Sequence, residues 1–495
     1  MKKKIIGGIS LLLMVVVMAT SLFMLTRKNE KRNYGKLYED PNVEQVVIYL
    51  DPFPGWYNLF YANGGLETTQ GSINAQNGIR VKYVLENNAE TSADKIISGE
   101  ANGMGVTINR LSYLNNRFED NGVKVIMPFV TNYSNGGDGV ICTKDINYIE
   151  DLVGKKIAVP KYSEGHLLVE WLLKSFNLTE EQINQIHKDM VYCNDGEETA
   201  ELFARGEVDA AATWEPTMTN IISSMEARVL FDTTLSTELI MGGLVFEDEF
   251  AKTHEDFLVK LIDGAIEAKP YYMSDIELLS QMDAFASMSD EEIFESGQFT
   301  QTTTWADNIS LLGGTCQKVY KEMANLWISI GEKSDPSKAE SIFTDKYVKM
   351  LDGKYPKDEV TSFKFSEEGR KAAENLSENA TLLKMKLNIE FESDSAIITE
   401  KSKKDLVEFA EAAKLLNNAY IRIEGNTAKV EGTDGEEFSL KRANNVKKQL
   451  QLMGIDPKRM NTIGNGDTKP VASNNTEEGR AKNRRTEVTF YTIGF

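Results

Sequence analysis

A chain of 495 residues is too long for one ordinary domain and predicts two to four. Its 55 Lys and Arg stand against 75 Asp and Glu, and the net charge of −20 excludes a uniformly cationic surface for nucleic acid. With 41% hydrophobic and 26% charged residues, the sequence is that of a globular protein rather than a disordered one.

The N-terminal segment, residues 1–33, predicts a membrane anchor. MKKK is followed by 21 uncharged residues, Ile5 to Leu25, and a helix of that length spans about 31 Å, enough for the hydrocarbon core of a bilayer. A cleaved signal peptide is the alternative, with Val17-Met18-Ala19 as a tolerable cleavage site. The apolar run continues past that site, which favours an uncleaved anchor. Basic residues flank both ends and do not orient it.

Strand-like and helix-like segments alternate over residues 40–350. VEQVVIYL (43–50), IRVKYVL (79–85) and VDAAATW (208–214) have the β-branched or apolar character of strands. Their alternation with helical segments favours an α/β architecture with largely parallel sheets. The region has no nucleophile elbow, P-loop or paired-acid motif, so we predict no enzyme.

The cysteines and histidines of the chain predict neither a metal site nor a cofactor. The three cysteines, Cys142, Cys193 and Cys316, are far apart and form no CxxC or Cys/His spacing. We expect them to be small buried hydrophobic residues. The three histidines form no HxxxH pair.

The character of the sequence changes after residue 350. Residues 351–383 are polar with short helical pieces and predict a partly helical linker. Residues 384–495 then predict a β-α-β-α-β-β domain. Its second helix is expected to start at Ser439 as N-cap and to stop at Gly454.

Two blocks of this C-terminal unit resemble the OmpA/MotB-type peptidoglycan-binding domains. The helix FSLKRANNVKKQLQLMG matches the LSxxRAxxVxxxL pattern of that family at Ser439, Arg442, Ala443, Val446 and Leu450. A second block shares residues with the family at Gly464, Gly466, Pro470, Asn474, Thr476, Gly479, Arg480, Asn483, Arg484 and Arg485. The resemblance implies an OmpA-like fold that binds the diaminopimelate side chain of the cell-wall stem peptide.

By this resemblance Arg442 holds the carboxylate of diaminopimelate, a role suited to a guanidinium. The acid that would hold the ammonium group falls at Ala428. Two hypotheses stay open: wall binding is weakened or lost, or a loop acid, Glu431 or Asp434, replaces the missing one. The predicted peptidoglycan site is Asn426, Thr427, Asp434, Arg442, Asn483 and Arg485. The arginines of the Asn483-Arg484-Arg485 block could equally pair with carboxylates of the fold itself.

Between residues 43 and 330, an ordered series of segments resembles periplasmic solute-binding proteins of the nitrate/sulfonate/taurine and thiamine-pyrimidine group. The segments are GWYNLFYANGGL, KIISGEANGMGVT, SNGGDGVICTKDI, YIEDLVGKKIAVPKYSEGHLLVEWLLKSFNL and LFARGEVDAAATWEP. The resemblance implies a type II-like periplasmic-binding fold, in which two α/β lobes joined by a hinge close on a small ligand.

The predicted ligand contacts follow a strand, open a helix or lie in a glycine-rich turn. They are Trp56, Asn135, Asp138, Ser163, His166, Trp214 and Glu215. Free N–H groups where the helix after Ser163 begins could hold an anion. Structural alternatives exist: Trp56 could be core, Ser163 a helix cap and Asp138 a turn former. The loops offer Asp138, Glu164 and Glu215 rather than basic groups, which favours an amine-bearing or neutral ligand.

Together these features predict a membrane-anchored extracytoplasmic protein that captures a small molecule for an ABC importer or a sensor and is tethered to peptidoglycan. Wall binding requires an N-in orientation, with the bulk of the chain on the periplasmic or cell-wall side. Expected partners are the solute, peptidoglycan, the membrane and an ABC permease, without nucleic acid. The alternative is a structural wall tether whose solute domain no longer binds. A thiamine-pyrimidine synthase is disfavoured because the cysteine cluster of that branch is not found.

Overall fold

The computed structural model describes residues 36–492 except 177, 281, 283–284, 286–287, 362–364, 373–381, 388, 393–394 and 430–434. The predicted anchor at residues 5–25 lies outside these residues. Among the residues that are described, no helix combines the length and the apolar character needed to cross a membrane.

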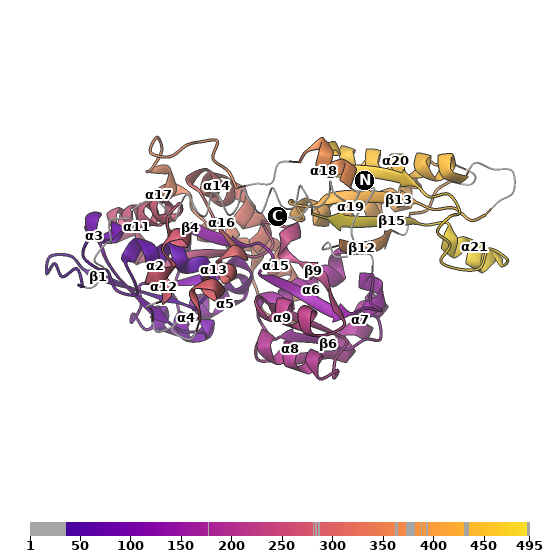
Figure 1. The fold of residues 1–495 in the computed structure, drawn as a ribbon. Helices are drawn as coiled ribbons and strands as arrows, with labels where there is room; N and C mark the ends of the chain where they lie inside the picture. The colour runs from indigo at the N-terminus through magenta and orange to yellow at the C-terminus, as the bar shows by residue number, and fades with distance from the viewer. Residues whose placement is uncertain are drawn as a thin grey trace, which may run out of the picture.

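Three sheets organise the described chain, two in the solute-domain lobes and one in the C-terminal domain (Figure 1). Their strand orders are β11-β4-β10-β3-β1-β2, β7-β6-β8-β5-β9 and β12-β15-β13-β14. The strands are β1 (Gln45–Leu50), β2 (Arg80–Leu85), β3 (Gly103–Thr107), β4 (Val125–Ser134), β5 (Asp138–Thr143), β6 (Ile157–Pro160), β7 (Met190–Cys193), β8 (Ala210–Trp214), β9 (Ala227–Asp232), β10 (Met241–Glu247), β11 (Thr300–Thr302), β12 (Leu382–Leu387), β13 (Tyr420–Gly425), β14 (Met460–Gly464) and β15 (Thr486–Tyr491).

Helices cover the faces of these sheets. In the first lobe and its C-terminal extension they are α2 (Tyr57–Asn63), α3 (Ile73–Gln76), α4 (Ala89–Ile97), α5 (Ile108–Asp120), α10 (Asp248–Thr253), α11 (Glu255–Ala268), α12 (Ile276–Ser280), α13 (Asp290–Gln298), α14 (Trp305–Ser310), α15 (Cys316–Ser329), α16 (Ala339–Ile342) and α17 (Lys346–Lys349). The second lobe has α6 (Glu164–Ser175), α7 (Glu180–Asp189), α8 (Gly196–Ala204) and α9 (Thr217–Ser224). The C-terminal unit has α18 (Glu367–Ala372), α19 (Glu400–Leu415), α20 (Gly435–Leu452) and α21 (Glu477–Asn483).

The chain crosses between the lobes twice, at residues 134–138 and 232–240, which we call the first and second hinge crossings. Parallel pairs join β1 to β2 and β3, and β6 to β7 and β8. The strands next to the crossings, β4, β5, β9 and β10, pair antiparallel with their neighbours. The expectation of largely parallel sheets is therefore wrong, because β10 in the first lobe and β5 in the second run against the strands on both sides of them.

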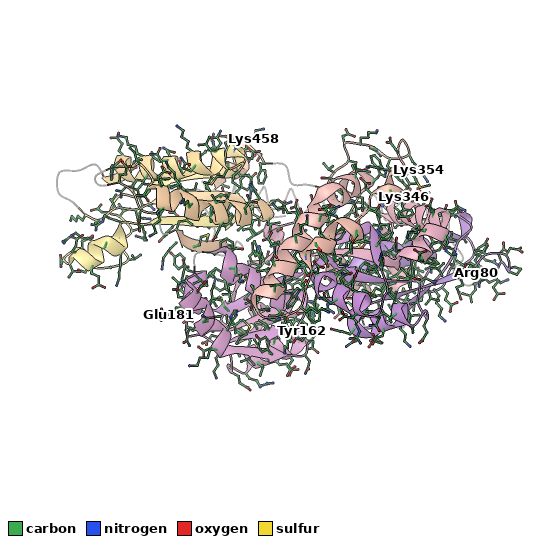
Figure 2. The ribbon with its side chains drawn as sticks, turned by 180° about the vertical axis from the view of Figure 1, so that it is seen from behind. Arg80, Tyr162, Glu181, Lys346, Lys354 and Lys458 are labelled. Carbon is green, nitrogen blue, oxygen red and sulfur yellow. The ribbon has the colours of Figure 1, made fainter. Side chains whose placement is uncertain are left out.

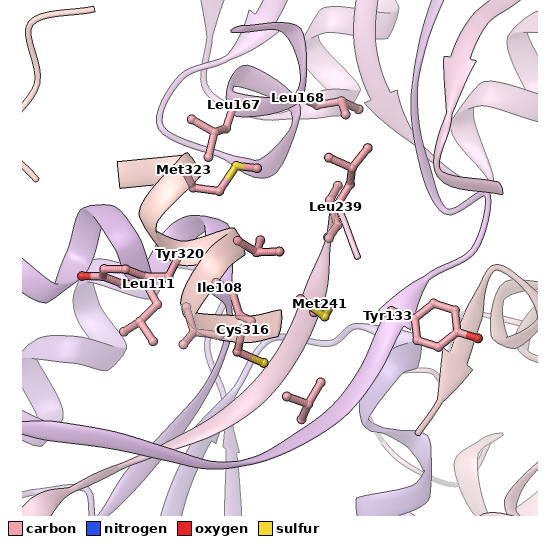
Figure 3. Packing of buried hydrophobic residues seen from close by; sticks show 14 of the residues in the cluster. Ile108, Leu111, Tyr133, Leu167, Leu168, Leu239, Met241, Cys316, Tyr320 and Met323 are labelled. Carbon is pink, nitrogen blue, oxygen red and sulfur yellow. The ribbon is translucent and has the colours of Figure 1, made fainter. Parts of the chain in front are cut away.

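A continuous apolar core extends through both lobes, and α15 connects its two halves. Figure 3 shows side chains of α15 between those of α5 and α6. The residues in view include Ile108, Leu111, Leu167, Leu168, Cys316, Tyr320 and Met323. All three cysteines are buried and free, which confirms the expectation from their spacing.

The C-terminal domain has the predicted order of strands and helices, with the short α21 added before the last strand. Its second helix starts at Gly435 rather than after Ser439. Ser439 is not an N-cap because its buried hydroxyl lies in the second turn, where it accepts from Gly466 N at 3.0 Å. Helix α20 ends at Leu452, and Gly454 has the positive φ of 96° expected after a helix end.

The segment that joins the two parts of the chain packs on both. Trp305 Nε1 donates to Val348 O at 2.8 Å, and Tyr355 OH donates to Asp263 Oδ1 at 2.7 Å, so residues near α17 belong to the first lobe. Beyond residue 364, Ser366 N donates to the hydroxyl of Tyr420 at 2.9 Å, in the C-terminal sheet. Helix α18 thus packs with the C-terminal domain.

We expect Asn308→Ala to lower the free energy of unfolding of the first lobe by about 2–3 kcal/mol. Asn308 is fully buried; its Oδ1 accepts from Val130 N at 2.9 Å, and its Nδ2 donates to Thr304 O at 3.0 Å. The substitution leaves the buried Val130 N–H without this partner. Urea unfolding followed by tryptophan fluorescence measures the loss. Asn325→Ala, at an exposed position of α15, is the control and should change stability by under about 0.5 kcal/mol; equal effects would contradict this role.

Candidate functional site

Polar side chains meet where β1 and β3 of the first lobe end opposite the start of α6 in the second. Asp51 follows β1, Thr107 ends β3 and Arg110 lies in the first turn of α5. Glu164 is the first residue of α6, and Asp138 is the first of β5. All five residues are half-buried. We call them the interlobe site; strand ends and helix starts of this kind form ligand sites in α/β folds.

Glu164 bonds the two lobes to each other. Arg110 Nη2 lies 2.7 Å from Glu164 Oε2, and Thr107 Oγ1 donates to Glu164 Oε1 at 2.6 Å. Arg110 Nε has no hydrogen-bond partner within the described ranges of the chain. The interlobe site therefore brings three carboxyl groups to one guanidinium, a donor set that suits a cation.

The pKa values in the site reflect its burial and this crowding of acids. Burial raises the pKa of Asp138 to about 7; a Ser134 hydrogen bond opposes the rise, and the charge of Glu164 adds to it. Burial likewise raises the pKa of Asp51. Burial also opposes ionisation of Glu164, but Arg110 and Thr107 outweigh it and hold the pKa of Glu164 below its usual value. A bound cation would favour the charged form of all three acids.

Trp56 positions Asp51 and is itself core. It is 2% exposed, and its Nε1 donates to Asp51 Oδ1 at 2.6 Å. The ring lies against β3 so closely that a Cβ on Gly105 would come within 2.8 Å of it. The structural alternative for Trp56 fits this burial, and direct ligand contact by its ring stays a prediction.

Ser163 and His166 have structural bonds at the start of α6. Ser163 Oγ donates to Pro160 O at 2.5 Å and accepts from His166 N at 3.4 Å, so it caps the helix. His166 is buried; its Nδ1 accepts from Tyr162 N at 3.3 Å, and its ring packs edge-on against Trp327 at 5.4 Å. Ligand binding by Ser163 and His166 stays a prediction.

Trp214 and Glu215 lie at the end of β8 and are half-buried. Trp214 Nε1 donates to Glu197 Oε1 at 2.8 Å. Glu215 accepts from the backbone N and the hydroxyl of Thr219, at 3.0 and 2.8 Å. Asn135 is half-buried in the first hinge crossing. Of the predicted residues, Asp138 is the one that joins the interlobe acids, and roles for the others as ligand contacts stay predictions.

Sequence reasoning missed Asp51, Thr107 and Arg110. Two of the three had a local signal, since Asp51 directly follows the predicted strand at 43–50 and Thr107 ends the segment KIISGEANGMGVT. What the sequence did not supply is the pairing of β1 with β3, which places their ends side by side.

Tyr162 makes a second contact between the lobes and is labelled at their boundary in Figure 2. Its ring stacks on Tyr113 of α5 with centroids 4.8 Å apart, and its hydroxyl donates to Glu332 Oε1 at 3.0 Å. Its φ of 61° lies in the left-handed region, which is uncommon for a residue other than glycine. Together with the Arg110–Glu164 pair, this contact holds the lobes against each other.

In the C-terminal domain, the guanidinium of Arg442 is held in place by its neighbours. The guanidinium carbon lies 4.6 Å from the ring centroid of Phe391 and 4.5 Å from that of Phe438. Nε and Nη2 both donate to Ser395 O, at 3.2 and 3.1 Å. The two rings and the carbonyl fix the direction of a half-buried guanidinium, as recognition of a carboxylate requires.

The turn after β13 contains polar atoms without partners. Asn426 is 2% exposed; its Oδ1 accepts from Asn465 Nδ2 at 3.1 Å, but its Nδ2 has no partner among the residues that the structure describes. Thr427 Oγ1 is also buried and has no partner in the described part of the chain. Ala428, at the position of the expected acid, is buried as well. Buried polar atoms of this kind are rare in folded proteins and mark a site that a ligand could complete. Asp434, like Glu431, lies outside the described residues.

Asn483 and Arg485 are bonded within the fold. Asn483 Oδ1 accepts from Val471 N at 2.8 Å and from Ala472 N at 2.9 Å. Arg485 Nε donates to Glu487 Oε1 at 2.6 Å. These bonds fit the structural alternative for this block, and wall contact by either residue stays a prediction.

Two family models match separate parts of this chain. One, described as NMT1/THI5 like, matches residues 75–275, and the other, the OmpA family, matches residues 390–484. Among solved structures, the chain is similar to the periplasmic nitrate-binding protein NrtA of Synechocystis, with a TM-score of 0.49, 12% identity and coverage of 66% of this chain and 92% of that one.

Curated relatives match the C-terminal segment. The peptidoglycan-associated lipoprotein of Buchnera aphidicola is 32% identical over 119 residues, which are 24% of this chain and 68% of that protein. Outer membrane porin F of Pseudomonas aeruginosa is 36% identical over 111 residues, 22% of this chain and 31% of that protein. The chain spans between 31% and 51% of the length of the first relatives.

We expect Asp138→Asn to raise the melting temperature more at pH 8 than at pH 5. The pKa of Asp138 is about 7 in the folded chain, against an ordinary value of 3.8. Between these two pH values the folded state therefore holds one more proton on Asp138 than the unfolded state does. As a result, Asp138 makes stability fall as the pH rises from about 4 to 7. Asparagine removes that dependence. Scanning calorimetry at both pH values measures the gain.

The control for this effect is Asp145→Asn. The hydrogen bond from Lys155 lowers the pKa of Asp145 to about 2, so this carboxylate is ionised at both pH values. Its substitution should shift the melting temperature equally at pH 5 and pH 8. An equal shift for Asp138→Asn would contradict the assigned pKa.

Proposed function

This chain joins an NMT1/THI5-like solute-binding domain to a C-terminal domain that belongs to the OmpA family, and we propose its function on that basis. The chain acts as an extracytoplasmic receptor that captures a small molecule between its lobes and is held at the cell wall by its C-terminal domain. The charge of the interlobe site supports the first part, and the order of the two domains supports the second.

The captured solute is a small cation or an amine-bearing molecule. The observation that carries this choice is the meeting of Asp51, Asp138 and Glu164 with Arg110 as the one cation of the site. An ammonium or amidinium group placed there takes over Glu164 from Arg110 and lies within reach of the other acids, in a half-buried setting that strengthens charge pairing. An anion there would compete with Glu164 for Arg110 and would lie beside the carboxyl groups of Asp51 and Asp138.

The C-terminal domain binds the diaminopimelate stem peptide through Arg442. Support comes from the fixed guanidinium of Arg442 and from the turn where the ammonium would lie. There the hydroxyl of Thr427, which has no partner among the described residues, can accept a hydrogen bond from the ammonium. Asn426 Nδ2 is a donor and suits a carbonyl or carboxylate oxygen of the stem peptide instead. The printed name of one relative, a peptidoglycan-associated lipoprotein, agrees with this assignment. Because Ala428 replaces the acid, we expect the binding to be weak.

Residues 5–25 anchor the chain in the cytoplasmic membrane with the N-terminus inside. Their uncharged length supports this placement, and a wall-binding domain is useful only outside the membrane. A receptor fixed at both membrane and wall would deliver its solute to a neighbouring ABC permease or report its presence to a sensor.

A structural wall tether is the second candidate. It is favoured by the fact that Glu164 is already satisfied by Arg110 and Thr107, so that the lobes hold each other without a solute. The two candidates differ in whether any solute stabilises the chain.

We expect amine-bearing solutes to raise the melting temperature of the full-length chain, whereas nitrate, an alkanesulfonate and a neutral sugar do not. A solute at 100 times its Kd stabilises the folded state by about 2.7 kcal/mol, which a thermal-shift screen detects. Glu164→Gln should weaken binding of the hit at least about tenfold by calorimetry. Glu181→Gln, at an exposed position of α7, is the control. Stabilisation by anions alone would refute the cation assignment, and stabilisation by no solute would favour the tether.

We expect the full-length chain to sediment with purified diaminopimelate-type peptidoglycan and Arg442→Ala to abolish this. Ala428→Asp should strengthen sedimentation about tenfold or more, since it supplies an anion for the ammonium. Lys441→Ala changes the exposed neighbour of Arg442 and should have no effect. No sedimentation until Ala428→Asp is introduced would mean that the fold is kept and wall binding is lost.

A further inference from the structure

The turn between α19 and β13 of the C-terminal domain lies on the second hinge crossing of the solute-binding domain (Figure 1). Asn418 Nδ2 donates to Thr234 O at 2.7 Å. Asn417 Oδ1 accepts from Thr237 N at 2.9 Å, while its Nδ2 donates to Thr237 Oγ1 at 2.8 Å and to Glu238 Oε1 at 3.1 Å. Two neighbouring asparagines therefore bind the crossing through both its backbone and its side chains.

The residues between these contacts are bound too. Ser236 Oγ donates to Leu415 O at 2.5 Å, and Asn418 N donates to Leu235 O at 3.2 Å. Ser236 and Leu235 are buried, as is Asn418. The C-terminal domain thus contacts every residue from 234 to 238, the segment in which the chain passes from the second lobe back to the first.

The same crossing holds the first crossing on its other side. Thr233 Oγ1 shares a hydrogen bond of 2.7 Å with Ser134 Oγ and accepts from Gly136 N at 2.9 Å. It also accepts from Asp138 N at 3.4 Å, directly beside the interlobe site. The second crossing is therefore packed between the candidate solute site and the C-terminal domain.

The C-terminal domain is also fixed to the second lobe. Its edge strand β12 lies beside β9, the edge strand of that lobe (Figure 1). Lys386 of β12 donates its backbone N to Glu150 Oε1 at 3.2 Å, and its Nζ lies 4.3 Å from the ring centroid of Tyr148. The rings of Phe176 and Phe490 meet at 6.1 Å. Buried and charged contacts together make this an interface with a defined geometry.

We propose that the OmpA-family domain sets the angle between the lobes by binding the hinge, so that opening of the solute site requires the contacts of Asn417 and Asn418 with residues 234–238 to change. Hinge motion needs changes in backbone dihedral angles at the crossings, and six hydrogen bonds to one crossing oppose them. If the proposed function holds, solute capture and the placement of the wall-binding domain then share one coupling free energy, and each alters the other.

The test measures the angle between the lobes without any solute, and its outcome is thus independent of the proposed function. Spin labels are placed on the full-length chain in detergent at Lys124→Cys in the first lobe and Lys188→Cys in the second, both exposed; the native cysteines are buried. Pulsed electron–electron double resonance should give one main distance between the two labels. When Asn417→Ala and Asn418→Ala are added, the population of a second inter-label distance should increase at least about fivefold. Each lost hydrogen bond can change the equilibrium between the two lobe arrangements by up to about a factor of ten.

Asn475→Ala, at an exposed position before α21 and away from the hinge, is the matched control and should keep the single distance. Thr237→Ala weakens the same contact from the hinge side and decides the question if the double variant does not fold, as judged by circular dichroism. A second distance in either folded hinge variant, absent from the control, supports the proposal. The native distance alone in every hinge variant that folds overturns it.

Discussion

The hydroxyl of Thr233 is the point on which the arrangement of the lobes depends. It bonds the two hinge crossings to each other through Ser134 and Gly136. The crossings are the covalent connections between the lobes, and β4, β5, β9 and β10 extend from them as antiparallel strands into both sheets. A small displacement at this point is transmitted to both sheets because packed cores move as units rather than deform continuously.

In the interlobe site, the same charged groups that hold the lobes together would also have to bind the solute. Glu164 is paired with Arg110 across the lobes, and the partly buried setting makes loss of either partner costly. A cationic solute has to replace this pairing rather than add to it, so part of its binding free energy is used to release Arg110. Such a site favours cations that contact Asp51 and Asp138 as well, because one salt bridge gained for one lost yields little affinity. Selectivity then comes from the number of acids a solute reaches.

The sequence was informative about single elements and less so about which elements are neighbours. Strand-like runs at 43–50, 79–85 and 208–214 lie on β1, β2 and β8, since β-branched and apolar runs fit buried strands. Asp138 was found because it lies in a glycine-rich turn, whereas Arg110 and Asp51 join the site only through the pairing of β1 with β3. The start of α20 was misplaced because Ser439, a good capping residue by type, bonds Gly466 of a distant turn instead. Local propensity cannot reveal such a competing tertiary partner.

Because the C-terminal domain is fused to a solute-binding domain, the replacement of the wall-binding acid by Ala428 has a different consequence from the one it would have in an isolated domain. A C-terminal domain that only anchors a protein benefits from tight binding, and loss of the acid would be a defect. A domain that also holds a hinge has to move or loosen when the lobes open, and very tight attachment to a fixed wall would resist that movement. Arg442 is kept in a fixed geometry, while Ala428 stands at the position of the expected acid and Asn426 Nδ2 has no partner among the described residues. Modest wall affinity is therefore consistent with a domain whose position must respond to the solute site.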